Sequence, residues 1–173
     1  ASLERSGAGR MSTVTVFQTD ARDLISGGCP PQNIGSAFIR GISGEVRRPL
    51  GPRWSLRAHA TLQEALDRAT GAPLPRVPAF SAQAVLTRDA GGSSLTLLAG
   101  YVGPRADVDF SVFPAAAVTL QGYVDVALRY QLRTASGWTV SIGVDNALDA
   151  TYEVVKGYPV PGRTVFLSAS RSY

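Results

Sequence analysis

The sequence predicts an all-β fold, a transmembrane antiparallel β-barrel of which about eight strands are present. Apolar and polar residues alternate along each strand-like stretch, as expected where one face of a strand meets lipid and the other a wet lumen. The 173 residues include 18 Gly and 11 Pro, which indicate frequent turns. No run approaches the roughly 18 consecutive apolar residues that a membrane helix needs. The apolar residues are therefore expected along alternating strands.

Eight stretches have the length of membrane-crossing strands. Most have about nine to thirteen residues, enough to cross a bilayer at a tilt of about 45°. Strands of soluble proteins usually have about five or six residues. In chain order the eight stretches are about residues 11–19, 36–48, 53–64, 79–88, 94–102, 120–132, 138–145 and 164–173.

Two different faces are clearest in residues 53–64 and 120–132. A slip of one residue would move every charge into the wrong solvent, so the register is well specified. The apolar face contains Trp54, Leu56, Ala58, Ala60, Leu62, Val124, Val126, Leu128, Tyr130 and Leu132. The polar face contains Ser55, Arg57, His59, Thr61, Gln63, Asp125, Ala127, Arg129 and Gln131.

The links between the stretches alternate in length. Outer-membrane barrels have tight periplasmic turns and long extracellular loops, and this alternation follows that asymmetry. The short links are therefore predicted on one side of the membrane and the long links on the other. The short links are residues 49–52, 89–93 and 133–137, and the long links are residues 20–35, 65–78, 103–119 and 146–163.

The positions of the aromatic residues separate two kinds of barrel. A soluble lipocalin-like barrel has the same alternation with its apolar face inward. Two aromatic belts around an aliphatic band instead favour rings anchored at both headgroup levels of a membrane. Trp54, Trp138, Tyr130 and Tyr173 fall near the short links, and Tyr101, Tyr123, Tyr152 and Tyr158 near the long links.

Two motifs lie near the end of the chain. The pattern Asn-x-Leu-(Asp/Asn)-x-x-Tyr is matched by Asn146, Leu148, Asp149 and Tyr152, and the pattern Gly-Tyr-x-x-Pro-Gly-Arg by Gly157, Tyr158, Pro161, Gly162 and Arg163. In these motifs the chain resembles the C-terminal end of the TonB-dependent outer-membrane receptors, particularly those of the cobalamin and siderophore type.

The resemblance implies a fold larger than this chain. Family members have a barrel of about 22 strands around an N-terminal plug, and nothing here resembles the plug. Residues 1–173 are thus expected to be the C-terminal segment of such a barrel, with the plug and about fourteen strands absent. The chain begins at Ala1 with neither an initiator Met nor a signal peptide, so we expect a processed product or a piece of a longer protein.

The resemblance also implies a function and partners. The intact protein would be a transport receptor in the outer membrane of a Gram-negative bacterium, energised by the TonB complex. It would contact outer-membrane lipid and its own plug domain, and it would take up a metal chelate or a cobamide without a resident cofactor. Loops around Cys29, Thr70, Asp107 and Glu153 would form part of the vestibule.

The closing strand resembles the segment that the outer-membrane assembly machinery reads in this family. Val165, Leu167, Ala169 and Tyr173 fit its alternate apolar pattern, although the family prefers Phe or Trp at the last position. Arg171 departs from the pattern because it falls on the lipid face. A long Arg near the interface reaches the headgroups, so its cost should be small.

Other functions find little support. The 17 basic residues are scattered along the chain, which disfavours a nucleic-acid partner. His59 is the only His and its strand neighbours supply no carboxylate, so we expect no enzyme and no His-rich metal site. Asp107 and Asp109 are too few to form a cation site. Cys29 has no partner for an internal disulfide.

A second hypothesis is a self-sufficient eight-stranded outer-membrane barrel with a structural or adhesive role. The strand count is even, and the first strand would pair with the eighth to close the barrel. The small polar-face candidates Ser141, Gly143, Ser168 and Ser170 count against it, because they would leave such a narrow barrel underfilled.

The face assignment predicts opposite outcomes for two Arg substitutions in residues 120–132. Leu128→Arg should lower the free energy of unfolding by roughly 2–4 kcal/mol, because its charge would lie near the bilayer midplane. Gln131→Arg on the opposite face should be tolerated. A denaturant titration of each refolded variant measures the difference. Equal damage from both substitutions would show that the faces are assigned wrongly.

Overall fold

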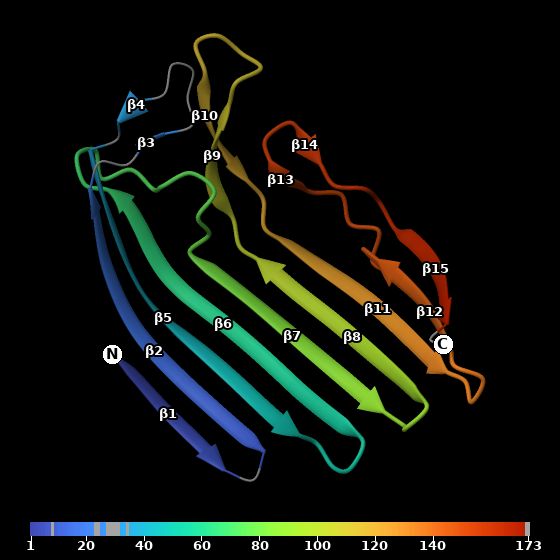
Figure 1. Cartoon of the computed structure of the whole chain (residues 1–173). Helices are drawn as coiled ribbons and strands as arrows, with labels where there is room; N and C mark the ends of the chain where they lie inside the picture. Colours follow the sequence, from blue (N-terminus) through green and yellow to red (C-terminus); the bar gives the residue numbers. More distant parts are fainter. Residues whose placement is uncertain (8, 23–24, 27–31, 34, 172–173) are drawn as a thin grey trace.

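The computed structural model describes residues 1–7, 9–22, 25–26, 32–33 and 35–171. Nine antiparallel strands form one sheet, and each pairs with its neighbours in chain order (Figure 1). Main-chain pairing is therefore between strands close in sequence throughout the sheet. The strands are β1 (Ser2–Gly7), β2 (Arg10–Arg22), β5 (Ser36–Pro49), β6 (Trp54–Asp67), β7 (Phe80–Asp89), β8 (Ser93–Val102), β11 (Tyr123–Arg133), β12 (Trp138–Asp145) and β15 (Thr164–Arg171).

The sequence-based count of eight strands misses β1. Leu3 is the only large apolar residue in this strand, so its sequence lacks the alternation that reveals the others. Its main chain nevertheless pairs with β2 from Ser2, opposite Thr15, to Gly7, opposite Arg10.

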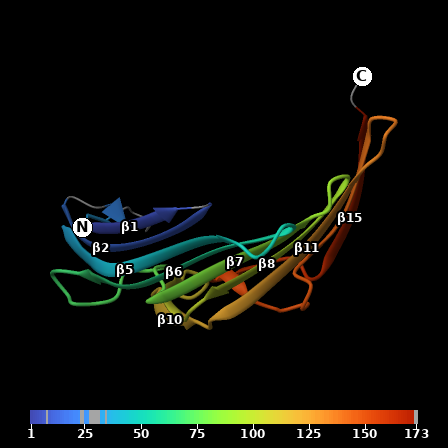
Figure 2. The same cartoon turned by 90° about the horizontal axis from the view of Figure 1, so that it is seen from below.

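The sheet does not close into the small barrel of the second hypothesis. Among the described strands β1 pairs only with β2 and β15 only with β12, so the first strand does not meet the last. Figure 2 shows a curved open sheet with β1 and β15 at its two edges. This arrangement has the form of one section of a larger barrel wall.

Three short hairpins lie within three of the four long links, which the sequence pattern predicts as loops. Their strands have only two to five residues, too few to show a period. Leu120, predicted in the sixth long strand, instead ends β10 and lies opposite Arg105 of β9. The hairpins are β3 (Ile25–Ser26) with β4 (Gln32–Asn33), β9 (Arg105–Asp109) with β10 (Ala116–Leu120), and β13 (Glu153–Val155) with β14 (Tyr158–Pro159).

The predicted separation of short and long links is confirmed. The turns β5–β6, β7–β8 and β11–β12 lie at one end of the sheet with the β1–β2 turn, and the long links leave from the other (Figure 1). We call these the short-link end and the long-link end. Gly51, Gly91 and Gly137 have φ of 91°, 76° and 81° in three of these turns, a conformation that other residues adopt at a cost.

The strand registers place the predicted apolar face on one side of the sheet. One cross-strand row contains Leu56, Leu86, Leu97, Leu128 and Val144 on five successive strands. Large apolar side chains on this face are exposed, up to 75% for Leu3 and 74% for Leu167. The opposite, polar face carries charged residues, which alternate with these apolar residues along the strands. No helix in the described part of the chain is long and apolar enough to cross a membrane.

On the polar face, one large aromatic ring covers part of the small residues. The ring of Phe166 on β15 covers Gly143 of β12, and a Cβ at Gly143 would lie 2.1 Å from a ring atom. The guanidinium of Arg129 lies 4.8 Å from the centre of the same ring. Here a glycine makes room for an aromatic ring, which fills part of the space above the small residues.

The separation of the two ends predicts which positions face the cell exterior. In a Cys29→Ser background of the full-length protein, Thr70→Cys should react with an impermeant thiol reagent on intact cells, because Thr70 is exposed at the long-link end. Ser136→Cys, in the β11–β12 turn, should react only after the outer membrane is permeabilised. Labelling of Ser136→Cys from outside would contradict the topology.

Candidate functional site

Three of the long links meet at the long-link end. The β6–β7 link supplies Arg76, the β9–β10 hairpin supplies Arg105 and Asp107, and the β13–β14 hairpin supplies Glu153 and Lys156. Strand β10 also contacts β13. We call this set of contacts the loop cluster, and it ties segments 31 to 49 residues apart in sequence.

Asp107 lies at the centre of the loop cluster. Its side chain has no exposed surface, and its carboxylate accepts hydrogen bonds from Arg76 Nε at 2.9 Å, Lys156 N at 2.8 Å and Val108 N at 2.9 Å. Burial opposes the charged form, but these hydrogen bonds outweigh burial and hold the pKa of Asp107 below its ordinary value. One carboxylate therefore joins three segments.

Arg105 provides a second connection between the same hairpins. Its side chain is almost fully buried, with 5% of the residue exposed. Nη2 donates to the carbonyl oxygens of Glu153 at 2.8 Å and Val154 at 2.9 Å. The guanidinium lies 5.4 Å from the ring centre of Tyr123, within range of a cation–π interaction. Arg105 thus fixes β13 against the first residue of β11.

Tyr123 and Tyr152 stack at the base of the cluster. Their ring centres are 3.8 Å apart and the rings are nearly parallel, at 9°. Burial, together with the negative charge of Asp125, raises the pKa of Tyr152 above its ordinary value. The stack joins β11 to the last long link.

Asn146 closes the start of that link. It is 5% exposed and has a φ of 47°, a conformation that Asn tolerates better than most residues. Its side chain donates to the carbonyl of Ala150 at 2.9 Å and to that of Pro161 at 3.2 Å, and accepts from Ala150 N at 2.9 Å. Asn146 thereby joins both ends of the link.

Asp149, Gly162 and Arg163 complete this closure. Asp149 Oδ1 accepts from Arg163 N at 2.8 Å, and Arg163 Nε donates to the carbonyl of Ala147 at 3.0 Å. A Cβ at Gly162 would lie 2.9 Å from Asp149 Oδ1, so a side chain there would displace the carboxylate. This contact gives a physical reason for glycine at position 162.

The remaining motif residues do not join the closure as side chains. Leu148 and Tyr158 are 58% and 73% exposed. Gly157 has a φ of 84° in the turn between β13 and β14. Five of the nine motif residues therefore act together to hold the last link against the end of β12, namely Asn146, Asp149, Pro161, Gly162 and Arg163.

The closing strand lies at the edge of the sheet. Val165 and Leu167 are exposed on the apolar face, and Ala169 lies opposite Val140 on the same face. Arg171 is opposite Trp138, with its guanidinium 5.8 Å from a ring centre of that residue. Tyr173, like Cys29, lies outside the described residues.

The two loop carboxylates Asp107 and Asp109, which lie close together in sequence, have separate roles. Asp107 is occupied by its three donors, whereas Asp109 accepts two hydrogen bonds from Ser111 within its own hairpin.

His59 is exposed on the polar face, with Nε2 3.4 Å from Thr61 Oγ1. Within the described residues, no group of three or more His, Cys, Asp or Glu could hold a metal ion.

Sequence reasoning missed Arg76, Arg105 and Lys156. Each contacts residues more than 30 positions away, so no local spacing indicates their role. The one local peculiarity is the φ of 65° at Arg76, which no sequence pattern reveals.

Residues 3–147 match the family model described as TonB dependent receptor-like, beta-barrel. The vitamin B12 transporter BtuB of Vibrio cholerae serotype O1 is 37% identical to this chain over 70 residues. That stretch is 39% of this chain and 11% of BtuB, so the match spans a small part of the relative.

Three solved structures have the same fold. A mutant of the ferric enterobactin receptor PfeA from Pseudomonas aeruginosa has a TM-score of 0.81 at 21% identity, over 99% of this chain and 30% of PfeA. The copper transporter OprC has a TM-score of 0.78 at 20% identity, over 99% and 30% of the two chains. The ferripyoverdine receptor of the outer membrane of Pseudomonas aeruginosa has 0.75 at 14%, over 93% and 24%.

Removal of the Asp107 carboxylate should loosen the loop cluster. Asp107→Ala leaves Arg76 and the Val108 and Lys156 amides without their acceptor, at a local cost of about 1–3 kcal/mol. Hydrogen-exchange protection of the Val108 and Lys156 amides should fall accordingly. Asp109→Ala, in the same hairpin, is the matched control and should leave both amides protected. Unchanged protection in Asp107→Ala would contradict the role of Asp107.

The same carboxylate should make the cluster sensitive to acid. Because the folded pKa of Asp107 is lowered, its contribution is fully present above the unfolded value of about 3.9 and is lost as the pH falls through the lower folded pKa. Protection factors, which correct for the intrinsic exchange rate, should therefore stay constant from neutral pH to about pH 5. A loss near neutral pH would point to another group.

Proposed function

Because the chain belongs to the TonB-dependent receptor β-barrel family, we propose that it forms the C-terminal part of the barrel of an outer-membrane transport receptor. The plug domain and the other strands would be supplied by the rest of the intact protein. The open, curved nine-stranded sheet supports this proposal, since its two edges need further strands before the barrel can close.

The intact receptor would take up a scarce, bulky ligand of the metal-siderophore or cobalamin type, with energy from the TonB complex. The similar proteins named above are a vitamin B12 transporter, receptors for ferric enterobactin and ferripyoverdine, and a copper transporter. They are transporters and receptors, which supports transport over catalysis.

The single observation that carries this proposal is the loop cluster around Asp107. A receptor must keep its extracellular loops in a conformation that fits the ligand, because ordering them on binding costs affinity. Buried contacts between Asp107, Arg76, Arg105 and the β13–β14 hairpin order three links in advance. The cluster would thus form one wall of the vestibule at the extracellular end.

The two faces of the sheet suit an outer-membrane location. The exposed Leu, Val and Ile side chains of the apolar face would contact lipid. The polar face would line the lumen that holds the plug. On this face Thr13 Oγ1 and Asp125 Oδ1 are shielded from solvent and have no hydrogen-bond partner within the described residues, which supports contact with a further polar surface.

Uptake measurements on the full-length protein test the proposal. Purified receptor is titrated with vitamin B12, ferric enterobactin, ferripyoverdine and Cu²⁺, and uptake of any ligand that binds is measured in cells with and without TonB. One of these ligands should bind, and its uptake should require TonB. Failure of all four to bind, or uptake that persists without TonB, would contradict the proposal.

Two variants test whether ligand binding depends on the loop cluster. Asp107→Ala should weaken ligand binding about tenfold, because the loops must then be ordered by the ligand. Asp109→Ala should bind like the parent protein. Equal affinities for all three proteins would place the ligand away from this wall of the vestibule.

A further inference from the structure

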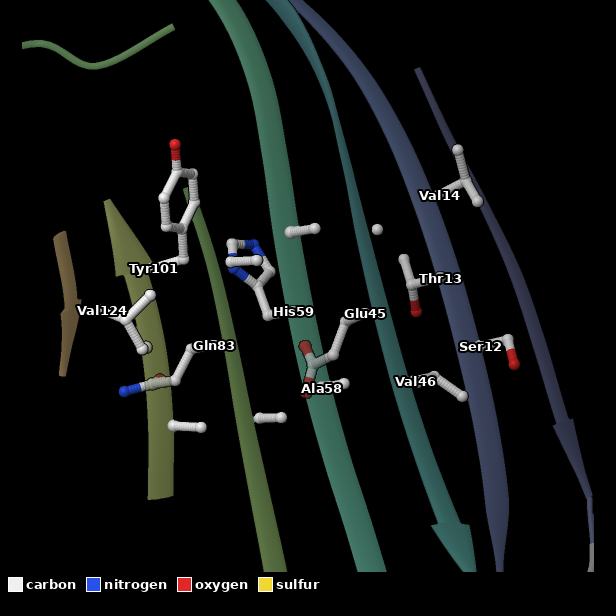
Figure 3. Close-up of a pocket in the computed structure, with 16 residues that line it drawn as sticks. Ser12, Thr13, Val14, Glu45, Val46, Ala58, His59, Gln83, Tyr101 and Val124 are labelled. Carbon is white, nitrogen blue, oxygen red and sulfur yellow. The ribbon is translucent and has the colours of Figure 1, made fainter. Parts of the chain in front are cut away.

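The apolar face contains an open depression of about 490 Å³. Small residues on four adjacent strands form its floor, namely Gly44 on β5, Ala58 and Ala60 on β6, Ala82 and Ala84 on β7, and Ala99 on β8. Figure 3 shows Val124 of β11 on one side and Val14 of β2 on the other, and Figure 1 shows these two strands in the reverse left-to-right order. The two figures thus view opposite faces of the sheet.

Rows of larger side chains border this depression on both sides. Towards the long-link end the bordering row contains Val16, Ile42, Leu62 and Phe80. Towards the short-link end it contains Leu56, Leu86, Leu97 and Leu128. The hollow is therefore a groove across the strands, and its volume is on the order of that of one fatty acyl chain.

Three arginines stand at the short-link side of the groove. Arg5 lies opposite Ser12, which lines the groove, and Arg48 continues the row of Leu56. Arg10 is two residues before Ser12 on the same face of β2. All three are exposed, and none has a hydrogen-bond or ion-pair partner within the described residues.

The other end of the same face has a different charge balance. There Arg40 pairs with Glu64 at 2.7 Å, and Arg68 pairs with Asp20. The carboxylates near Arg5 and Arg48 lie on the polar face, as shown by the pairing of Thr13 with both Glu4 and Glu45. Arg5, Arg10 and Arg48 therefore have no carboxylate beside them on their own face.

We propose that this groove holds one glycerophospholipid of the leaflet at the short-link end. One acyl chain lies along the floor of small residues, and the phosphate binds between Arg5, Arg10 and Arg48. Apolar burial supplies most of the affinity, and the arginines select a phosphate-bearing headgroup. This inference rests on the membrane location proposed above.

Native mass spectrometry tests the proposal on the full-length protein. The receptor is reconstituted with phosphatidylethanolamine and phosphatidylglycerol and then released into detergent, and the bound phospholipid is counted. One phospholipid should remain bound to the parent protein. The double variant Ala60→Leu/Ala84→Leu, which fills the groove, should reduce occupancy about tenfold. Arg10→Gln/Arg48→Gln should also reduce it.

Matched controls isolate the groove from the rest of the lipid-facing surface. Val140→Leu adds a methylene group to an aliphatic side chain on the same face outside the groove, and Arg88→Gln removes an exposed arginine of that face farther from Ser12. Both should retain the lipid. Equal retention by all variants would mean ordinary annular lipid only, and a lipid-free dimer would mean that a second copy covers the groove. Either result overturns the proposal.

Heat modifiability on gels distinguishes failure of the lipid site from failure of the proposed outer-membrane function. If the parent protein inserts as a heat-modifiable species but retains no phospholipid, only the lipid site is wrong. If it does not insert into the bilayer, the outer-membrane function is wrong as well.

Discussion

The structure depends on the requirement that a strand between lipid and water pairs all of its main-chain polar groups while keeping each side chain in its own solvent. The hydrocarbon core offers no partner for a free N–H or C=O group, so the ladder must run without a gap from strand to strand. Side chains alternate with a period of two, so a shift of one residue would exchange the two faces. The cross-strand row from Leu56 to Val144 shows the result, because every strand in it presents an aliphatic residue at the same level.

This constraint ends where the strands leave the apolar band, and different interactions take over there. At the short-link end a few residues with glycine at positive φ suffice to reverse the chain. At the long-link end the chain forms only short hairpins, and contacts of single side chains hold these together. Asp107 illustrates the difference, because its hydrogen bonds from Arg76 and Lys156, on two other links, replace the pairing that a long strand would provide. Loss of one such residue affects several links at once.

The part of the fold that could be predicted is the part governed by the local period. Residues 36–48 and 138–145 lie entirely within observed strands, because their alternation is visible in each stretch alone. The pattern failed at β1, where Leu3 has no apolar companions, and at Leu120, which belongs to a hairpin too short to show a period. The burial of Asp107 could not be predicted, because it depends on Arg76 and on the main chain of Lys156, which are 31 and 49 residues away. Resemblance located Asn146 and Gly162, but only the geometry explains why an amide and a missing side chain are needed there.

The long-link end and the short-link end of the sheet also differ in their excess positive charge. Exposed ion pairs such as Arg40–Glu64 contribute at most about 1 kcal/mol each, so their main effect is on the local potential. Near the long links they compensate the charges of Arg40 and Arg68 on the apolar face. At the other end Arg5, Arg10 and Arg48 have no carboxylate on their face, and the potential there is positive. A polybasic surface attracts lipid phosphates only within about 10 Å, so its effect is confined to the headgroups next to the groove. The sheet thus presents chemically different surfaces to the two leaflets, although the aliphatic band between them is continuous.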